Sequence, residues 1–391
     1  MRISWTSWPS RAVAVLVLMC GVTGFAAAGS QPQYLVTNDD GVLNSVTFYT
    51  VGTGGFLTLK QQVPTGGYGI GGGFFSANRV SALNSASQEC VYASDALTGT
   101  IVGIDLSTLL VDSSTFGSAA DSGTANGIGL AMNAQYLYAG FTTSNTIATF
   151  QLQPGCGLTF LNDVSVAGLQ GGFINGMAIN GNILVVTYGD GSIESFNIAS
   201  GTPVSNGDEQ NSSAYLKSQG VTYPNSVEIT EDGHFALFGD TSTSTVVEVS
   251  NISSGKLNPT VVYPLGAAIS SSNILLSPDE TLLYISNTQG DKITAAAFDK
   301  SNGKLSTGCA SGKIKGYSSN WSYLGSLALA SNSGTGGALY VAEFGATSSI
   351  GVIEVGSSGG TCTLTEATRS PVIDPTSPGL LSIGSFPPRS F

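Results

Sequence analysis

A short apolar strand motif that ends in a small or polar residue occurs seven times in this chain, and this repeat constrains the fold more than any other feature. Its copies end at Asn38, Asp95, Phe141, Tyr188, Asp240, Asn287 and Glu343. The intervals between these ends are 57, 46, 47, 52, 47 and 56 residues. A four-stranded blade of a β-propeller takes about 40 to 50 residues, and more where loops are long. Seven copies therefore predict seven blades.

Each copy of the motif is flanked by two further segments with strand character. The segment before it is short and begins with a small residue, as in residues 127–130 and 226–229. Such segments suit the crowded strands at the centre of a propeller. The segment after it alternates apolar and polar residues, as in residues 146–152, which is the pattern of a half-buried strand. We name the strands of a blade A to D from the centre outward, so the repeated motif is strand B.

The two ends of the chain are expected to meet in one blade. The first B strand, at residues 34–38, has no A strand before it, and residues 378–383 read Pro-Gly-Leu-Leu-Ser-Ile, the pattern of the missing strand. A C-terminal strand that joins the N-terminal blade closes the ring and leaves no open sheet edge at the seam. We therefore expect an all-β fold over residues 29–391, a single seven-bladed propeller with four-stranded antiparallel blades.

The composition agrees with this fold and limits the partners. Charged residues make up only 10% of the chain, so long surface helices with charged faces are not expected. Hydrophobic residues make up 41%, too many for a disordered chain. The 13 basic and 25 acidic residues give a net charge of −12, which argues against a nucleic-acid partner. We expect a monomer.

The N-terminal residues have the order of a secretory signal peptide. Arg2 and Arg11 precede an apolar run over residues 12–19, and three alanines end at Ala28. A membrane anchor is the alternative, but the apolar segment of residues 12–28 is short for a span. We expect cleavage after Ala28, which removes residues 1–28 and changes the net charge from −12 by −2 to −14. The mature protein would then be secreted, periplasmic or attached to the cell surface, with no membrane span.

Four cysteines remain in the mature chain: Cys90, Cys156, Cys309 and Cys362. An even number in an exported protein indicates two disulfides, and the spacing fits no zinc site. Free buried thiols are the alternative. Three pairings are possible, and we favour Cys90 with Cys156 and Cys309 with Cys362, because each pair would join adjacent blades.

The strand order brings polar residues to one end of the central channel. Strand A begins and strand B ends at this end, which we call the upper mouth. The candidate ligand-binding residues there are Asn38, Asp95, Asn126, Asn175, Tyr188, Asn225, Asp240, Asn287 and Glu343. Their oxygens suit the hydroxyl groups of a carbohydrate, or a calcium ion in the channel with Asp95, Asp240 and Glu343 as ligands. The alternative is that Asn and Asp favour turns and strand ends and bind nothing.

Two segments resemble the repeat phrase of a known family. Residues 223–233 read Tyr-Pro-Asn-Ser-Val-Glu-Ile-Thr-Glu-Asp-Gly, and residues 275–287 read Leu-Leu-Ser-Pro-Asp-Glu-Thr-Leu-Leu-Tyr-Ile-Ser-Asn. The chain is similar here to seven-bladed propellers of the lactonase type, which include 6-phosphogluconolactonases and bacterial surface proteins with YVTN repeats. The resemblance covers residues 34–383 and implies the fold. It does not imply one activity, because enzymes and binding proteins share the repeat.

A lactonase of this kind would place a histidine and an arginine beside acidic groups at the upper mouth, to bind the substrate and polarise its carbonyl. The one histidine of this chain, His234, directly follows an A to B hairpin and is expected at the opposite end. Arg79 is expected in another A to B loop, and Arg369 and Arg389 lie near the C-terminus. Lys292 is then the one cation expected at the mouth.

An acidic mouth would repel a phosphorylated substrate. The sequence therefore favours an exported binding or scaffold module, with a carbohydrate, a small neutral ligand or a surface protein as partner. A hydrolase for a neutral lactone, with Asp240 or Glu343 as general base, is the alternative. Residues 67–72 match the pattern G-x-G-x-x-G, but no helix follows them, so we expect no nucleotide site.

Overall fold

The computed structural model describes residues 33–70, 79–85, 87–117, 127–168, 171–209, 224–240, 246–265, 271–287, 291–315, 323–329, 337–344, 348–358, 361–374 and 382–388. The chain divides into residues 1–32 and residues 33–391. The expected signal peptide, residues 1–28, lies outside the described residues. In the part of the chain that the structure describes, no helix is long and apolar enough to cross a membrane.

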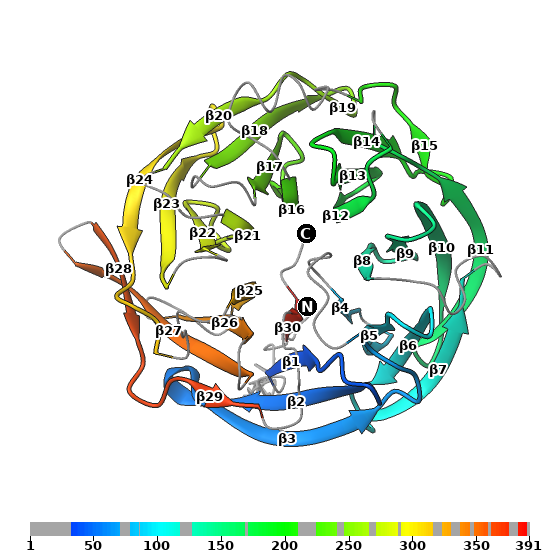
Figure 1. Ribbon diagram of the computed structural model, residues 1–391, viewed down its shortest axis with the longest axis horizontal. Helices are drawn as coiled ribbons and strands as arrows, with labels where there is room; N and C mark the ends of the chain where they lie inside the picture. The colour runs from blue at the N-terminus through cyan, green and yellow to red at the C-terminus, as the bar shows by residue number, and fades with distance from the viewer. Residues whose placement is uncertain are drawn as a thin grey trace, which may run out of the picture. The chain divides into compact units, whose positions relative to one another are not determined.

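Residues 33–391 form seven antiparallel sheets arranged as blades around a central axis (Figure 1). The inner A strands are β30 (Ser382–Phe386), β4 (Val80–Asn84), β8 (Ile128–Met132), β12 (Ile174–Asn180), β16 (Pro224–Ile229), β21 (Ser271–Leu276) and β25 (Tyr323–Leu329). The B strands are β1 (Tyr34–Asn38), β5 (Glu89–Asp95), β9 (Tyr136–Phe141), β13 (Ile183–Tyr188), β17 (Phe235–Asp240), β22 (Leu282–Asn287) and β26 (Ala338–Phe344).

The outer half of each blade holds the C and D strands. The C strands are β2 (Ser45–Val51), β6 (Thr100–Asp105), β10 (Thr146–Gln153), β14 (Ile193–Asn197), β18 (Val246–Ser253), β23 (Ile293–Asp299) and β27 (Ser349–Ser358). The D strands are β3 (Leu57–Pro64), β7 (Leu110–Phe116), β11 (Gly157–Ser165), β15 (Val204–Ser205), β19 (Lys256–Leu257) with β20 (Val261–Pro264), β24 (Lys304–Ala310), and β28 (Thr361–Glu366) with β29 (Val372–Ile373). The 3₁₀ turn η1 (Thr53–Gly55) connects β2 and β3. The predicted seven-bladed all-β fold is confirmed.

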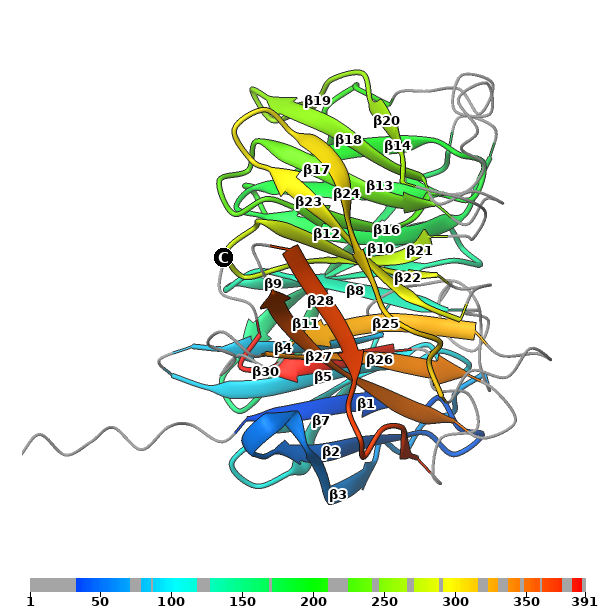
Figure 2. The same ribbon diagram turned by 90° about the vertical axis from the view of Figure 1, so that its left-hand side faces the viewer.

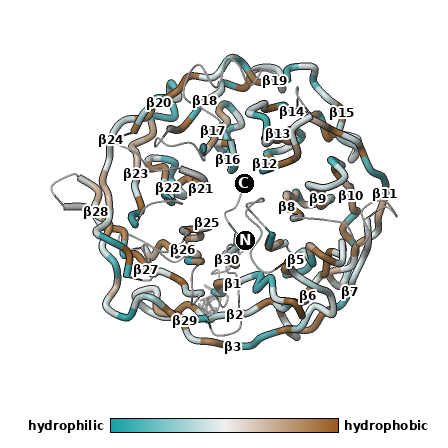
Figure 3. Tube along the Cα trace, viewed as in Figure 1, coloured by the Kyte–Doolittle hydropathy of each residue, from teal (hydrophilic) through white to brown (hydrophobic). Residues whose placement is uncertain are grey.

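The apolar run of each B strand follows from its place in the ring. All five residues of β1 and all six residues of β17 are buried, because adjacent blades pack against both faces of a B strand. The outer strands face solvent, and β3 accordingly has most of its residues exposed and only Val63 buried. Figure 3 shows this mixture of hydrophobic and hydrophilic residues along the strands.

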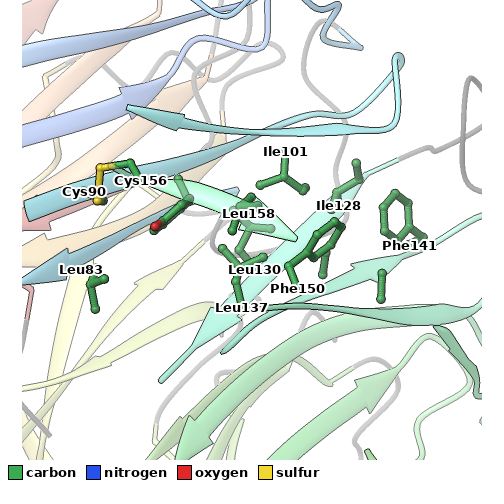
Figure 4. Packing of buried hydrophobic residues seen from close by; sticks show 13 residues of the cluster. Leu83, Cys90, Ile101, Ile128, Leu130, Leu137, Phe141, Phe150, Cys156 and Leu158 are labelled. Atoms are coloured by element: carbon green, nitrogen blue, oxygen red, sulfur yellow. A yellow bond between two sulfur atoms is a disulfide. The ribbon is translucent and has the colours of Figure 1, made fainter. Parts of the chain in front are cut away.

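The hydrophobic core is a series of layers between neighbouring blades. Seven clusters of buried apolar residues are present, one at each junction of two blades. The cluster between the second and third blades contains Tyr92, Leu130, Phe141 and Phe150 (Figure 4). Each blade is therefore stabilised mainly by its two neighbours, and an open ring would expose two of these layers to water.

The C-terminal strand closes the ring as predicted. β30 pairs with β1 over five residues, from Tyr34 with Phe386 to Asn38 with Ser382, and both views show β30 (red) at the N-terminal blade (blue) (Figures 1 and 2). The strand is displaced from the predicted residues 378–383, of which 378–381 lie outside the described residues. It continues beyond Ile383 because Phe386, 1% exposed, enters the core between the first and second blades.

Both favoured disulfides are present. Cys90, in β5, is bonded to Cys156, in the turn between β10 and β11 (Figure 4). Cys309, in β24, is bonded to Cys362, in β28. The first bond joins the second and third blades, and the second joins the outer strands of the sixth and seventh blades, so each bond constrains the chain across a junction.

Candidate ligand-binding site

The described residues predicted for the upper mouth lie at the expected ends of their strands, but they are buried. Their relative exposure is between 0 and 5% for Asn38, Asp95, Asn175, Tyr188, Asn225, Asp240, Asn287 and Glu343. Asn126 lies outside the described residues. A B strand is the second strand from the axis and is covered on both faces. Residues at its end therefore face the junction between blades, and the expectation that they line an open mouth does not hold.

Asp95 shows how such a carboxylate is enclosed. It accepts hydrogen bonds from Asn44 Nδ2 at 2.9 Å, Thr65 Oγ1 at 2.6 Å and Thr100 Oγ1 at 2.9 Å. Burial raises the pKa of Asp95, and these hydrogen bonds offset part of that effect. The loop that carries Gly67 lies directly against the carboxylate, since a Cβ added to Gly67 would come within 2.3 Å of Asp95 Oδ2. Gly67 thus allows the loop to pack closely over Asp95.

Asp240 and Glu343 are equally inaccessible. Ser349 donates a hydrogen bond to Glu343, whose pKa burial raises to about 7. Asp240 has a second buried acid nearby, Glu248, and burial together with the charge of Asp240 raises the pKa of Glu248 to about 8. These acids contribute to the interior of the fifth and seventh blades.

The amide and phenol groups of the predicted set make contacts within the fold. Asn38 Nδ2 donates to the Ser94 carbonyl at 2.8 Å, and Asn175 Nδ2 donates to the Pro224 carbonyl at 3.1 Å, each across a junction between blades. Tyr188 donates its hydroxyl proton to Glu194 at 3.0 Å, and burial followed by the charge of Glu194 raises the pKa of Tyr188. These contacts favour the structural alternative for this set of residues.

The expected calcium ligands are not brought together. Asp95, Asp240 and Glu343 belong to the second, fifth and seventh blades, and no group of three His, Cys, Asp or Glu residues placed to hold a metal occurs in the described ranges. In the described residues, the three acids expected as calcium ligands therefore do not form one cluster.

Arg79 is a second correction. It directly precedes β4, so it begins an A strand at the upper end of the channel and does not lie in an A to B loop. Its Nη1 lies 2.6 Å from Asp40 Oδ2, and both side chains are 2% exposed. Its backbone N–H donates to Ser382 Oγ at 2.9 Å. Arg79 therefore joins the first blade, the second blade and the closing strand.

Two other basic residues lie where the sequence placed them. His234 follows the hairpin between β16 and β17, at the opposite end from Asp240, with its side chain 68% exposed and its Nδ1 3.0 Å from Asp232 Oδ2. Lys292 lies in the turn between β22 and β23 at the upper end and is exposed.

A cavity of about 660 Å³ opens at the other end of the channel. Four inner strands, β4, β8, β12 and β16, form its wall, together with Pro388 after β30. Its lining residues are Ser81, Ala82, Leu83, Asn84, Ser85, Leu130, Ala131, Met132, Asn133, Ala134, Met177, Ala178, Ile179, Asn180, Gly181, Val227, Glu228, Ile229 and Pro388. We call it the lower channel cavity. Small-molecule sites are typically cavities of about 300–1,000 Å³ with apolar walls and few polar groups, and this cavity fits that description.

Sequence reasoning missed the lower channel cavity. The inner strands were identified in the sequence by their small residues. A binding site was predicted only from polar residues at the ends of strands. The signal that was present is the run of Leu, Met, Ile and Ala on four neighbouring A strands, which leaves one side of the channel both wide and apolar.

A family model described as "Lactonase, 7-bladed beta-propeller" matches residues 99–375. The chain belongs to this lactonase family. The match spans most of the second to seventh blades, and no curated protein matches the chain.

Solved structures resemble the lactonase-family propeller at low identity. A protein of unknown function from Desulfotomaculum acetoxidans is 16% identical, with 85% of this chain and 98% of that chain covered and a TM-score of 0.60. A candidate 6-phosphogluconolactonase from Bacteroides uniformis is 13% identical, with 70% and 80% covered and a TM-score of 0.54. A second from Bacteroides fragilis is 14% identical, with 70% and 79% covered and a TM-score of 0.53. Likeness at this level concerns the fold alone.

Proposed function

We propose that this lactonase-family propeller is an exported binding protein that takes a small, largely apolar ligand into the lower channel cavity. The observation that carries the proposal is the contrast between the two ends of the channel. Three acids of the upper end, Asp95, Asp240 and Glu343, are at most 2% exposed, whereas the lower end offers a cavity of about 660 Å³. A ligand can reach the lower channel cavity but not these three carboxylates.

The chemistry of the cavity supports binding without turnover. General acid–base catalysis needs a titrating group within hydrogen-bond reach of the substrate, and among the described residues of the cavity wall Glu228 is the one such group, beside apolar, hydroxyl and amide side chains. The apolar walls supply affinity by burial, at about 25 cal/mol per Å² of apolar surface. A cavity that can bind a ligand but presents no paired general acid and base favours a binding function over catalysis.

Export is supported by two independent features. Residues 1–28 have the pattern of a cleaved leader, and both disulfides need an oxidising compartment to persist. Expression in a host with the leader intact tests this point. Mass spectrometry of the protein recovered outside the cytoplasm should give an N-terminus at Gly29, and retention of the intact leader in the cytoplasm would contradict export.

Binding is tested by thermal unfolding of the mature protein with increasing 1-octanol. The melting temperature should rise with ligand concentration, because a ligand that binds only the folded state stabilises it. Ala178→Leu should fill the cavity and abolish the rise. The control is Ala199→Leu, an exposed residue outside the cavity, which should keep it. The absence of any rise in the unmodified protein, or a rise that survives Ala178→Leu, would contradict the proposed site.

A neutral-lactone hydrolase is the second candidate, which the family match favours. Its test is a panel of unphosphorylated lactones assayed with the mature protein, Asp240→Asn and Glu343→Gln. Hydrolysis above background that either substitution abolishes, with the fold intact by circular dichroism, would establish the enzyme. A flat panel supports the binding function.

A further inference from the structure

Two adjacent aliphatic side chains at the upper end of the first blade are the most exposed large hydrophobic groups in the described part of the chain. Val42 is 75% exposed and Leu43 is 76% exposed. Both lie in the turn between β1 and β2. A single exposed apolar residue is ordinary on a protein surface, so the surroundings of this pair decide whether it has a role.

Two further loops place exposed apolar side chains beside this pair. The loop after β3 carries Tyr68, and the turn between β5 and β6 carries Leu97, each 47% exposed. Backbone hydrogen bonds join the loops of these neighbouring blades (Figure 1). The Gly69 N–H donates to the Gly41 carbonyl at 2.7 Å, next to Val42. The Leu97 N–H donates to the Tyr68 carbonyl at 3.0 Å. The four exposed side chains therefore share one area of surface, which we call the upper apolar patch: Val42, Leu43, Tyr68 and Leu97.

The same loops contain acidic residues, and all of those in the described ranges are buried. Asp39, Asp40 and Asp95 are at most 1% exposed. Thr47 donates a hydrogen bond to Asp39 at 2.7 Å, and Asp40 pairs with Arg79 inside the ring. The described surface of the three loops is therefore uncharged, so an apolar environment can cover it without burying an exposed charge.

The exposed acids of the described residues lie away from the upper end. Two belong to outer strands, and the other four lie in turns at the opposite end of the blades: Asp112 and Glu354; Glu231, Asp232, Asp279 and Asp299. Lys292, in contrast, is exposed at the upper end. In a chain with a net charge of −12, this arrangement leaves the upper end as the side that an apolar surface can approach with the least loss of hydration.

The position of the patch on turns favours a lipid surface over a protein partner. A turn at the tip of a blade can enter fluid hydrocarbon without a matching socket, whereas a protein partner has to offer a complementary surface. Tyr68 suits the boundary between hydrocarbon and headgroups, because its ring is apolar and its hydroxyl is polar. An exposed group of apolar side chains of this kind marks a contact with a membrane or a protein, and here the uncharged tips fit the membrane.

We propose that the upper apolar patch binds the surface of a lipid bilayer, with Val42 and Leu43 among the acyl chains and the ring of Tyr68 at the level of the headgroups. The protein then lies on the membrane without crossing it. The lower channel cavity is at the opposite end of the channel and stays open to solvent. The inference goes beyond the proposed binding function and does not depend on the ligand of that cavity.

The test is co-sedimentation of the mature protein with phosphatidylcholine vesicles, because an uncharged patch needs no anionic lipid. Val42→Ser combined with Leu43→Ser should lower the partition coefficient about tenfold or more, since two aliphatic side chains no longer enter hydrocarbon. The matched control is Leu59→Ser combined with Leu110→Ser, at residues 56% and 59% exposed on β3 and β7. It should keep the binding, and both double variants should keep the melting temperature of the unmodified protein.

A tryptophan at the tip reports the inserted side chain directly. Leu43→Trp should be quenched by phosphatidylcholine that carries bromine on its acyl chains, because the indole then lies within the hydrocarbon. Leu110→Trp should be quenched no more than the unmodified protein. Equal quenching of the two variants would contradict insertion of the patch.

The other outcomes also decide the proposal. It is overturned if the unmodified protein does not sediment with the vesicles, or if the Val42 and Leu43 double variant sediments equally well. Binding that disappears in about 1 M sodium chloride, where the Debye length is about 3 Å, would assign the contact to charges and overturn it. A dimer that dissociates in the same double variant, measured by analytical ultracentrifugation, would assign the patch to a second copy of the chain and exclude the lipid.

Discussion

Arg79 Nη1 lies 2.6 Å from Asp40 Oδ2 inside the ring, with both side chains 2% exposed. Asp40 follows the B strand of the first blade, and Arg79 precedes the A strand of the second. The ion pair therefore crosses a junction between blades. The Arg79 carbonyl also accepts hydrogen bonds from Asn38 Nδ2 at 3.2 Å and from the Ser94 N–H at 3.0 Å. This junction is the one beside the closing strand β30.

Removing the arginine should destabilise the fold strongly. Arg79→Met leaves Asp40 buried without its cation, and breaking one partner of a buried pair costs about 3–5 kcal/mol. The double variant Arg79→Met with Asp40→Leu should lose less, because it leaves no buried charge. Urea unfolding with the disulfides intact measures both. The control is Lys292→Met at the same end of the channel, where the side chain is exposed. A double variant less stable than Arg79→Met would contradict this account.

Gly67 should not tolerate a side chain. A Cβ at this position would lie 2.3 Å from Asp95 Oδ2, and three hydrogen bonds hold that carboxylate in place. We expect Gly67→Ala to cost about 1–3 kcal/mol, as overpacking of an interior does. Gly312→Ala is the matched control, since nothing lies within 4 Å of its added Cβ. Equal unfolding midpoints for the two variants would show that the loop can move away from Asp95.

Stability should fall as the pH rises from about 5 to 8. Burial, and next the charge of Asp240, raise the pKa of Glu248 from 4.5 to about 8, and burial raises that of Glu343 to about 7. The folded state then binds more protons than the unfolded state in this window, so stability present at pH 4.5 is lost as the pH approaches 8.

Glu248→Gln isolates one part of this dependence. The substitution removes the titrating group, so the loss of unfolding free energy between pH 5 and 8.5 should shrink by on the order of 3 kcal/mol. Glu354→Gln, at an exposed residue, should leave the pH profile unchanged. Superimposable profiles for the unmodified protein and Glu248→Gln would refute the assignment.

Loss of the closing strand should destabilise the ring. Deletion of residues 377–391 removes β30 and its five pairs with β1, and uncovers the core layers that contain Ile383 and Phe386. The melting temperature should fall far more than after deletion of residues 389–391, which leaves β30 in place. Phe386→Ala tests the same contact without truncation, with an expected cost of about 3–5 kcal/mol. Unchanged melting after the longer deletion would mean that the seam does not depend on β30.

The seven-bladed ring was predictable from the sequence because each blade leaves its own short pattern in the chain. A B strand such as Tyr34–Asn38 is buried on both faces, so its apolar run is visible wherever it recurs. The closing strand followed from the absence of an A strand before Tyr34, and the disulfides followed from the adjacency of blades. The inner strand β4 was not predicted because Val80–Asn84 does not begin with a small residue, as the predicted inner segments at residues 127–130 and 226–229 do. The misplacement of Arg79 followed from that omission.

The site was not predictable in the same way, because burial depends on distant loops. Asp95 reads as a strand-end acid, and only the structure brings Gly67 against it. The lower channel cavity depends in the same way on four inner strands, β4, β8, β12 and β16, that lie far apart in the sequence and meet only in the ring.

The location of the ligand tests the central claim most directly. We would determine the crystal structure of the mature protein with 8-bromo-1-octanol and locate bromine by anomalous scattering. The account predicts a peak in the lower channel cavity, beside the inner strands β4, β8, β12 and β16. A bound ligand whose bromine lies instead at the upper end, near Asp95, Asp240 or Glu343, would contradict it.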